Sequence, residues 1–187
     1  MALRDSEHPP VELTATGRVI LGMLASGRRT GYDIKAFVDK TTRYFWAASY
    51  GQIYPELKRL EGQGLVRGRS QPSGGRARTV YELTEAGAAA LRRWLESDAE
   101  TLYELRDEGM LKLFFSDAAP AARMEIIRAM RAREERALAH LRSMEPHASA
   151  GPRGSYLTLQ LGIGLTESTI AWCEATERRL SAESEKD

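Results

Sequence analysis

The chain has 187 residues, of which 42% are hydrophobic and 28% are charged, and its formal net charge is +1 at pH 7. These values are typical of a globular protein and argue against wholesale disorder. Cys173 is the single cysteine and the three histidines are scattered, so an internal disulfide is excluded and neither a metal site nor a cofactor is expected. The apolar stretches are too short to cross a bilayer and the N-terminus lacks the apolar core of a signal peptide, which predicts a cytoplasmic protein without a membrane partner.

Opposite charges are separated along the chain, which the net value hides. Residues 58–78 carry six basic side chains and one acid, Glu61, whereas residues 96–108 carry six acids and one base, Arg106. We therefore expect the first segment to meet an anion. Its basic residues are Lys58, Arg59, Arg67, Arg69, Arg76 and Arg78.

The first predicted elements are an arm and two helices. Residues 1–13 show no periodicity and are predicted to form a flexible arm. Apolar residues at helical spacing predict a helix over 14–26, which ends at Gly27 because glycine adopts the conformation of a helix end without steric cost. Thr30 and Asp33 have the spacing of a capping box and predict the start of a second helix.

A third helix and a β-hairpin follow. Ser49 and Gln52 form another predicted capping box, and Gly64 ends the helix that this box begins. Short β-prone runs on either side of turn residues then predict two strands. The inward face of the helix consists of Ile53, Leu57 and Leu60, and the strands and their turn occupy residues 65–69, 79–83 and 72–76.

The N-terminal half closes with a fourth helix. Thr84 is its predicted N-cap, and Leu91, Trp94 and Leu95 are predicted to face inward. The order of three helices, two strands and one helix is that of a winged helix-turn-helix domain, which we place at residues 14–96. The predicted fold class is mainly α with a small β-hairpin.

Residues 97–187 are predicted to be a helical dimerisation domain. Helices are expected through residues 102–115, in a long helix that has Asp117 as its N-cap and Pro120 near its start, and in a final helix over 155–182, with a loop at 144–154. The final helix is apolar on more than one face, so it needs more partners than its own subunit supplies. A second subunit is the expected partner, with Leu161, Leu165 and Trp172 as candidate dimerisation residues.

The third helix is the candidate recognition helix. The second helix of a helix-turn-helix enters the major groove N-terminus first, and glutamine can form two hydrogen bonds with adenine. Hydroxyl groups and cations can contact phosphates. Capping alone, however, also accounts for Ser49 and Gln52. The candidate DNA-binding residues on or near this helix are Lys35, Ser49, Tyr50, Gln52, Tyr54, Lys58 and Arg59.

The hairpin, which we call the wing, gives the stronger indication. Four like charges on a small ribbon repel each other, so folding gains nothing from them, whereas a polyanion removes that cost and releases counterions on binding. Arginine is also favoured in a narrow minor groove. A merely solvated hairpin is the alternative. The four side chains are Arg67, Arg69, Arg76 and Arg78, and no acid lies between them.

Several segments resemble the PadR family of bacterial regulators. The most specific is GQIYPELKRLE at residues 51–61, supported by YELTEAG at 81–87. The segments at 112–115 and 170–174 resemble the family's longer C-terminal domain. The resemblance implies a homodimer, usually a repressor, that binds an inverted-repeat operator on double-stranded DNA and in some members is released by a small aromatic effector. It also implies that Tyr54 contacts phosphate and that Arg76 and Arg78 belong to the DNA-binding wing.

The residues also bear on functions other than DNA binding. The chain lacks a nucleophile elbow, a phosphate-binding loop and a dinucleotide fingerprint, so no enzyme is predicted. A winged helix can also bind protein, but the arginines argue against that use. A redox-responsive regulator would act through Cys173, although the apolar helical setting of this residue favours an inert thiol. An effector pocket between domains or subunits has as its candidates Trp46, Trp94 and Trp172.

Overall fold

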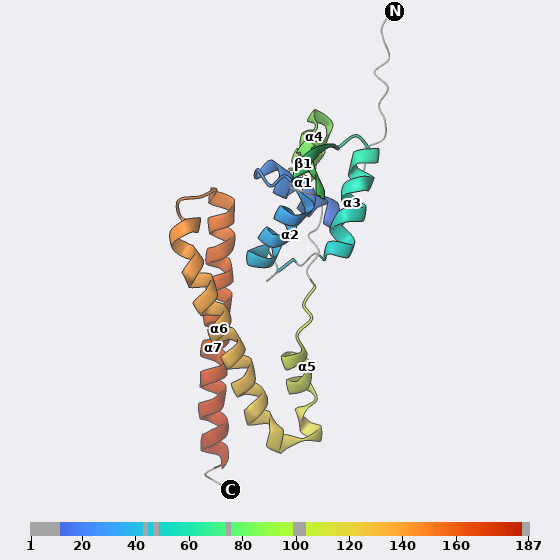
Figure 1. The fold of residues 1–187 in the computed structure, drawn as a ribbon. Coiled ribbons are helices and arrows are strands. Elements are labelled where there is room, and N and C mark those ends of the chain that lie inside the picture. The colour runs from blue at the N-terminus through green and yellow to red at the C-terminus, as the bar shows by residue number, and fades with distance from the viewer. Residues whose placement is uncertain (1–11, 43–44, 47–48, 74–75, 99–103, 185–187) are drawn as a thin grey trace, which may run out of the picture. The chain divides into compact units, whose positions relative to one another are not determined.

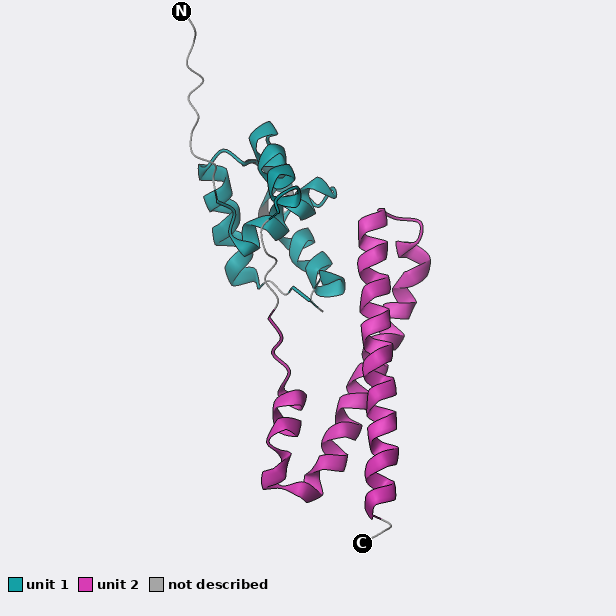
Figure 2. Ribbon diagram, turned by 180° about the vertical axis from the view of Figure 1, so that it is seen from behind, with its two compact units in different colours: residues 1–101 teal, residues 102–187 magenta. Residues whose placement is uncertain are grey.

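The chain forms two compact units, Met1–Thr101 (unit 1) and Leu102–Asp187 (unit 2), shown in teal and magenta in Figure 2. No helix within the part of the chain that the structure describes is both long and apolar enough to span a membrane. The computed structural model describes residues 12–42, 45–46, 49–73, 76–98 and 104–184, without the side chains of residues 73, 76 and 77.

Unit 1 has the predicted winged helix-turn-helix architecture (Figure 1). Three helices precede a two-stranded antiparallel hairpin, and a fourth helix follows it. In chain order these elements are α1 (Ala15–Ala25), α2 (Gly31–Lys40), α3 (Tyr50–Gly62), β1 (Val66–Ser73), β2 (Arg76–Leu83) and α4 (Glu85–Leu95).

Local signals position the ends of these helices. The hydroxyl groups of Thr14, Thr30 and Thr84 each accept a hydrogen bond from a backbone N–H in the first turn of the helix that follows. Gly27 and Gly64 have φ values of +87° and +70°, in the left-handed region where a β-carbon is disfavoured. The predicted ends of the first and third helices are therefore confirmed.

The wing is longer than predicted. Its ladder extends from the pair Val66 and Leu83 to the pair Ser73 and Arg76, so the expected turn residue Pro72 lies within β1. The predicted turn at 72–76 was too long, because both strands of a two-stranded ribbon are edge strands and an edge strand can contain a proline. A proline on an edge strand loses no ladder hydrogen bond when its nitrogen faces away from the partner.

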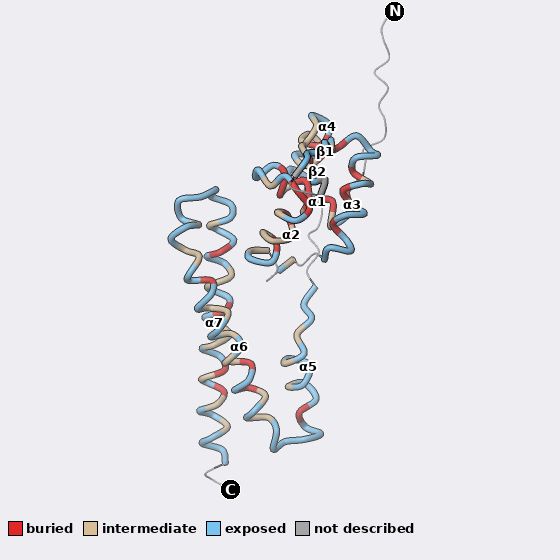
Figure 3. The backbone as a smooth tube through the Cα atoms, viewed as in Figure 1, coloured by how far each residue is buried: buried red, intermediate tan, exposed pale blue. Residues whose placement is uncertain are grey.

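One hydrophobic core joins the elements of unit 1 (Figure 3). The predicted inward face of α3 is fully buried in it. Leu13, which the sequence places in the arm, is also buried in this core. Trp94 and Leu95 are exposed, so their predicted inward position was wrong. The first turns of α4 lie close to the core, where Gly87 and Ala90 are buried, and the last turn of the helix extends past the core.

Unit 2 consists of a short helix followed by a long helical hairpin. The long helices run antiparallel, since the ion pairs Arg131–Glu177 and Arg142–Glu167 join them, and their seam buries Ile127. The elements are α5 (Glu108–Phe114), two 3₁₀ turns (η2, Ser116–Ala118, and η3, Pro120–Ala122), α6 (Arg123–Ala148) and α7 (Arg153–Ser184).

Two predictions for unit 2 need correction. The loop expected at 144–154 is shorter, because α6 continues to Ala148 and contains Pro146 in its last turn, although this proline removes one backbone hydrogen bond. The segment around Pro120 forms 3₁₀ turns in place of a helix start, and the expected N-cap Asp117 pairs with Arg123 at 2.5 Å.

Candidate nucleic-acid interface

Helix α3 is amphipathic, and its buried face fixes which side chains reach solvent. Since Ile53, Leu57 and Leu60 have no exposed surface, the opposite face must point outward. The exposed side of this helix carries Tyr50, Gln52, Tyr54, Pro55 and Lys58.

The N-terminus of α3 uses the predicted capping box. The Ser49 N–H donates to Gln52 Oε1 at 2.9 Å, and the Ser49 hydroxyl donates to the same oxygen at 3.1 Å. Both acceptor positions of this oxygen are therefore occupied, and the amide nitrogen of Gln52 remains as a donor. A two-bond contact with adenine would require the box to open, whereas a single donated bond would not.

Two tyrosines form an aromatic surface on α3. The rings of Tyr50 and Tyr54 are stacked with centroids 6.2 Å apart, and both are exposed. Tyr54 also packs on Gly31 at the start of α2, where a β-carbon would lie 2.7 Å from the ring. This close approach orients the tyrosine hydroxyl, and a β-carbon at position 31 would force the ring to shift.

The two predicted cations Lys35 and Arg59 are engaged within unit 1. Lys35 pairs with Asp39 on its own helix, and its side chain is only 15% exposed. Arg59 donates to both oxygens of Glu56 at 2.9 and 2.7 Å. This hydrogen-bonded guanidinium is the main cause that lowers the pKa of Glu56, which also accepts from Thr14 at the start of α1. Glu56 thus ties α3 to the start of α1 through Thr14, and the charge of Arg59 is largely offset by Glu56.

The register of the wing places three arginines on one face. Arg67 lies opposite Glu82, Arg69 opposite Val80, and Arg78 opposite Gln71. No described pair sets one arginine directly against another, so the repulsion is smaller than the sequence suggested. The other predicted wing cation, Arg76, lies in β2, but its side chain is outside the described residues.

The wing arginines differ in their partners. Arg67 and Arg69 are exposed and have no ion pair among the residues that the structure describes. Arg78 instead donates through Nη2 to Asp33 Oδ2 at 2.7 Å and to Thr30 Oγ1 at 3.3 Å. The sequence assigned Asp33 only to the helix cap, so this partner was missed. Nothing local signals a contact across 45 positions.

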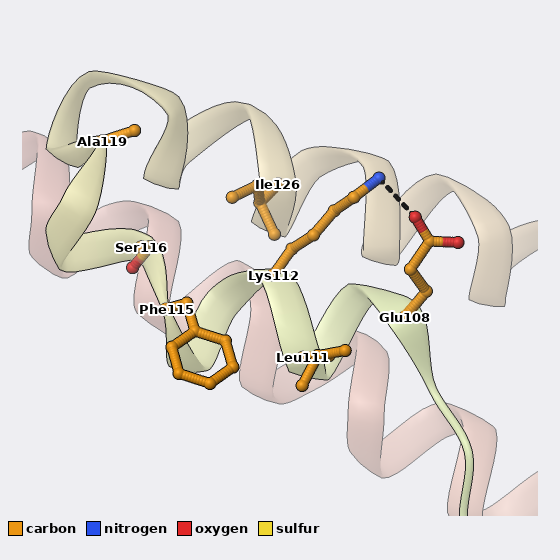
Figure 4. A pocket seen from close by; sticks show the side chains of 7 residues that line it. All are labelled: Glu108, Leu111, Lys112, Phe115, Ser116, Ala119 and Ile126. Atoms are coloured by element: carbon orange, nitrogen blue, oxygen red, sulfur yellow. Dashed lines mark ion pairs between the residues drawn. The ribbon is translucent and has the colours of Figure 1, made fainter.

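The predicted effector residues are divided between the two units. Trp46 and Trp94 belong to unit 1 and Trp172 belongs to unit 2. Unit 2 has an open hollow of about 440 Å³ between α5 and α6, where Lys112 pairs with Glu108 at 2.8 Å (Figure 4). None of the three tryptophans lines this hollow. Its lining residues are Glu108, Leu111, Lys112, Phe115, Ser116, Ala119 and Ile126.

The predicted dimerisation residues lie on the outer face of α7. Leu161 and Leu165 are 63% and 61% exposed, and Trp172 is also exposed. Cys173 lies on the opposite side with no exposed surface, and burial raises the pKa of its thiol. A thiolate is therefore disfavoured at Cys173. Within the described ranges, no group of three or more His, Cys, Asp or Glu residues could hold a metal ion.

The comparisons with known proteins agree with this architecture. Residues 20–93 match the model of the transcriptional regulator PadR-like family, and residues 105–181 match the virulence activator alpha C-terminal model. The negative transcriptional regulator PadR of Bacillus subtilis is 29% identical over 167 residues, which cover 83% of this chain and 92% of the relative.

Two crystal structures of Bacillus subtilis PadR are similar over most of the chain. The structure in complex with operator DNA has a TM-score of 0.81 at 26% identity and covers 90% of this chain and 99% of that one. The structure in complex with p-coumaric acid has a TM-score of 0.73 at 26% identity and covers 88% and 97%. The chain therefore has the two-part organisation of PadR-like transcriptional regulators, with a PadR-like domain at residues 20–93 and the longer C-terminal helical domain at residues 105–181.

Proposed function

We propose that this regulator binds double-stranded operator DNA through α3 and the wing. The observation that carries the proposal is the placement of three cations, Lys58, Arg67 and Arg69, on the exposed parts of one winged helix, where none of them has an ion pair with a residue that the structure describes. Unpaired cations at an exposed surface gain most from phosphates, because no internal ion pair has to be broken. The similarity to a PadR that was crystallised with operator DNA supports this reading.

Fluorescence anisotropy with DNA from upstream of the protein's own gene tests the proposal. Each phosphate contact contributes about 0.9 to the slope of log K against log salt, so a change present in both subunits of a dimer should lower the slope by about 2. Arg67→Gln and Arg69→Gln should each have this effect. The matched control is Arg128→Gln, which removes an exposed charge from α6. Unchanged slopes in both wing variants would contradict the proposal.

We further propose a homodimer that binds a palindromic operator. The support is the apolar outer face of α7, which no described part of unit 2 covers around Leu161 and Leu165. Paired recognition helices would have to meet major grooves about 34–36 Å apart. Sedimentation analysis should show that Leu161→Glu shifts the protein toward monomer, while Gln160→Glu, one position along the same helix, does not. A footprint of one asymmetric half-site bound by a monomer would refute the symmetry.

The proposed sign of regulation is repression. It rests on the similarity to a relative that is itself a negative regulator. Activation is the second candidate, because the C-terminal match is to a domain of virulence activators. Transcript levels of operator-linked genes should rise when the gene for this protein is deleted, and a fall would establish activation.

A small aromatic molecule is the proposed effector. The support is the similarity to a PadR that was crystallised with p-coumaric acid. The candidate contacts remain Trp46, Trp94 and Trp172. Addition of p-coumaric acid should lower the anisotropy of a DNA complex and quench tryptophan fluorescence. Repeating the titration with Trp94→Leu shows whether that side chain reports on the site, and an inert panel of aromatic acids would remove the effector from the proposal.

A further inference from the structure

The wing is attached to the rest of unit 1 mainly at its base. Near the base, the Tyr81 N–H donates to the carbonyl oxygen of Arg29 at 2.7 Å, and the Gly68 N–H donates to Glu61 Oε1 at 2.8 Å. Arg29 also pairs with Glu82 at 3.3 Å. These contacts hold the first rungs of the ladder, but they leave the rungs toward the tip without support.

Arg78 makes the described contact with the body of unit 1 that lies furthest toward the tip of the wing. It pairs with Gln71 across the ladder, three rungs beyond Tyr81, and its guanidinium reaches Asp33 and Thr30 at the start of α2. The side chains of Arg78 and Asp33 are 51% and 36% exposed, so the pair lies at the edge of the surface and not in the core. Both bonds come from Nη2, so this end of the guanidinium is held between oxygen atoms of two residues.

We propose that Arg78 and Asp33 form a clamp that sets the angle of the wing, so that Arg78 is a positioning residue for DNA binding and not a phosphate contact. This inference rests on the proposed DNA-binding function. Asp33 is already held by its place in the first turn of α2, where its backbone N–H donates to Thr30 Oγ1. The clamp therefore connects the hairpin to a rigid helix start and presents Arg67 and Arg69 at one orientation.

Asp33→Asn separates this inference from simple electrostatics. Removing a carboxylate from a surface that meets a polyanion should strengthen DNA binding if charge alone matters. The clamp predicts the opposite sign. A half-exposed ion pair contributes little in isolation, so we expect affinity to fall by about two- to fivefold, with an unchanged salt slope.

A double-mutant cycle completes the DNA measurements. Arg78→Gln should lower the DNA affinity as much as Asp33→Asn does. The double variant should have an affinity no lower than that of the weaker-binding single variant, because both changes remove the same contact. Asp39→Asn is the matched control, since it removes a carboxylate from α2 that pairs with Lys35 and not with the wing. This control should bind DNA at least as tightly as the unaltered protein.

Hydrogen exchange without DNA tests the clamp independently of the proposed function. Asp33→Asn and Arg78→Gln should each accelerate amide exchange in the wing rungs beyond Tyr81, whereas Asp39→Asn should not. The inference is overturned if exchange is unchanged, if Asp33→Asn binds DNA as tightly as the unaltered protein, or if Arg78→Gln lowers the salt slope by about 2 as a phosphate contact would. A protein that bound no DNA but showed the predicted exchange would retain the clamp and lose the proposed function.

Discussion

Replacing Gly87 by alanine should destabilise unit 1, although alanine favours a helix over glycine by about 1 kcal/mol. Gly87 lies in the first turn of α4, where its N–H donates to the capping hydroxyl of Thr84 at 3.1 Å. This turn packs directly on the backbone that leads from α3 into β1. Helix propensity and packing therefore predict opposite signs for the same substitution.

The steric cost follows from the position of the added methyl group. A β-carbon at Gly87 would lie 2.0 Å from the carbonyl oxygen of Leu65, whereas non-bonded heavy atoms prefer about 3.5 Å. Relief requires a shift of about 1.5 Å, which would stretch the hydrogen bond from the Thr84 N–H to that oxygen, now 3.2 Å long. Overpacking against backbone costs about 3 kcal/mol, so the net loss after the gain in propensity should be about 2 kcal/mol.

Urea denaturation of the full chain measures this loss. Fluorescence of Trp94 in α4 reports on unit 1 when Trp46 and Trp172 are replaced by phenylalanine. Gly22→Ala in α1 is the matched control, because no described atom outside the backbone of its own helix lies within 4 Å of the added carbon, and it should stabilise the unit by about 0.5–1 kcal/mol. The reasoning is refuted if both alanine variants raise the stability alike.

Three further outcomes follow from single contacts. The Arg133 guanidinium is the main cause that holds the pKa of Asp107 below its ordinary value of 3.8. The ion pair therefore stabilises unit 2 above pH 3.8, and this stabilisation is lost as the pH falls through the lowered pKa. Below pH 3.8, the urea midpoint should depend less on pH in Asp107→Asn than in the unaltered protein. The buried thiol of Cys173 should react with a disulfide reagent only after unfolding, and a response to peroxide that disappears in Cys173→Ser would contradict this assignment. Gly31→Ala should displace the ring of Tyr54 and weaken DNA binding, although the Tyr54 hydroxyl is still present. Fluorescence anisotropy of this variant and of Tyr54→Phe with the same DNA would measure the two effects.

The features that the sequence predicted well depend on neighbouring residues. A threonine before a helix and a glycine after one act within a single turn, so Thr30, Thr84, Gly27 and Gly64 could be assigned without knowledge of the fold. The period of the apolar residues likewise identified the buried face of α3. The winged helix followed from the order of such elements.

The errors arose where distant residues decide the outcome. Asp33 satisfies the same local pattern whether or not it binds Arg78, and no signal in either segment identifies the pair. Trp94 continues the apolar spacing of α4, but the core ends before the last turn of the helix. Spacing defines a face of a helix, whereas only the packed structure defines how far along that face the core extends.

The basic segment at 58–78 shows what this distinction means for DNA binding. A charge count treats all six of its cations as equivalent, but Arg59 is paired with Glu56 and Arg78 with Asp33. If either arginine left its carboxylate to contact a phosphate, the carboxylate would remain unpaired beside the polyanion. This exchange of partners would therefore add little to the binding free energy. We therefore expect Lys58→Gln to lower the salt slope of a dimer by about 2, as a free cation should, and Arg59→Gln to leave it unchanged while it reduces the stability of unit 1. Equal slopes for the two variants, measured on the same DNA, would show that the Arg59–Glu56 pair opens on binding and that the isolated structure understates the charge available to DNA.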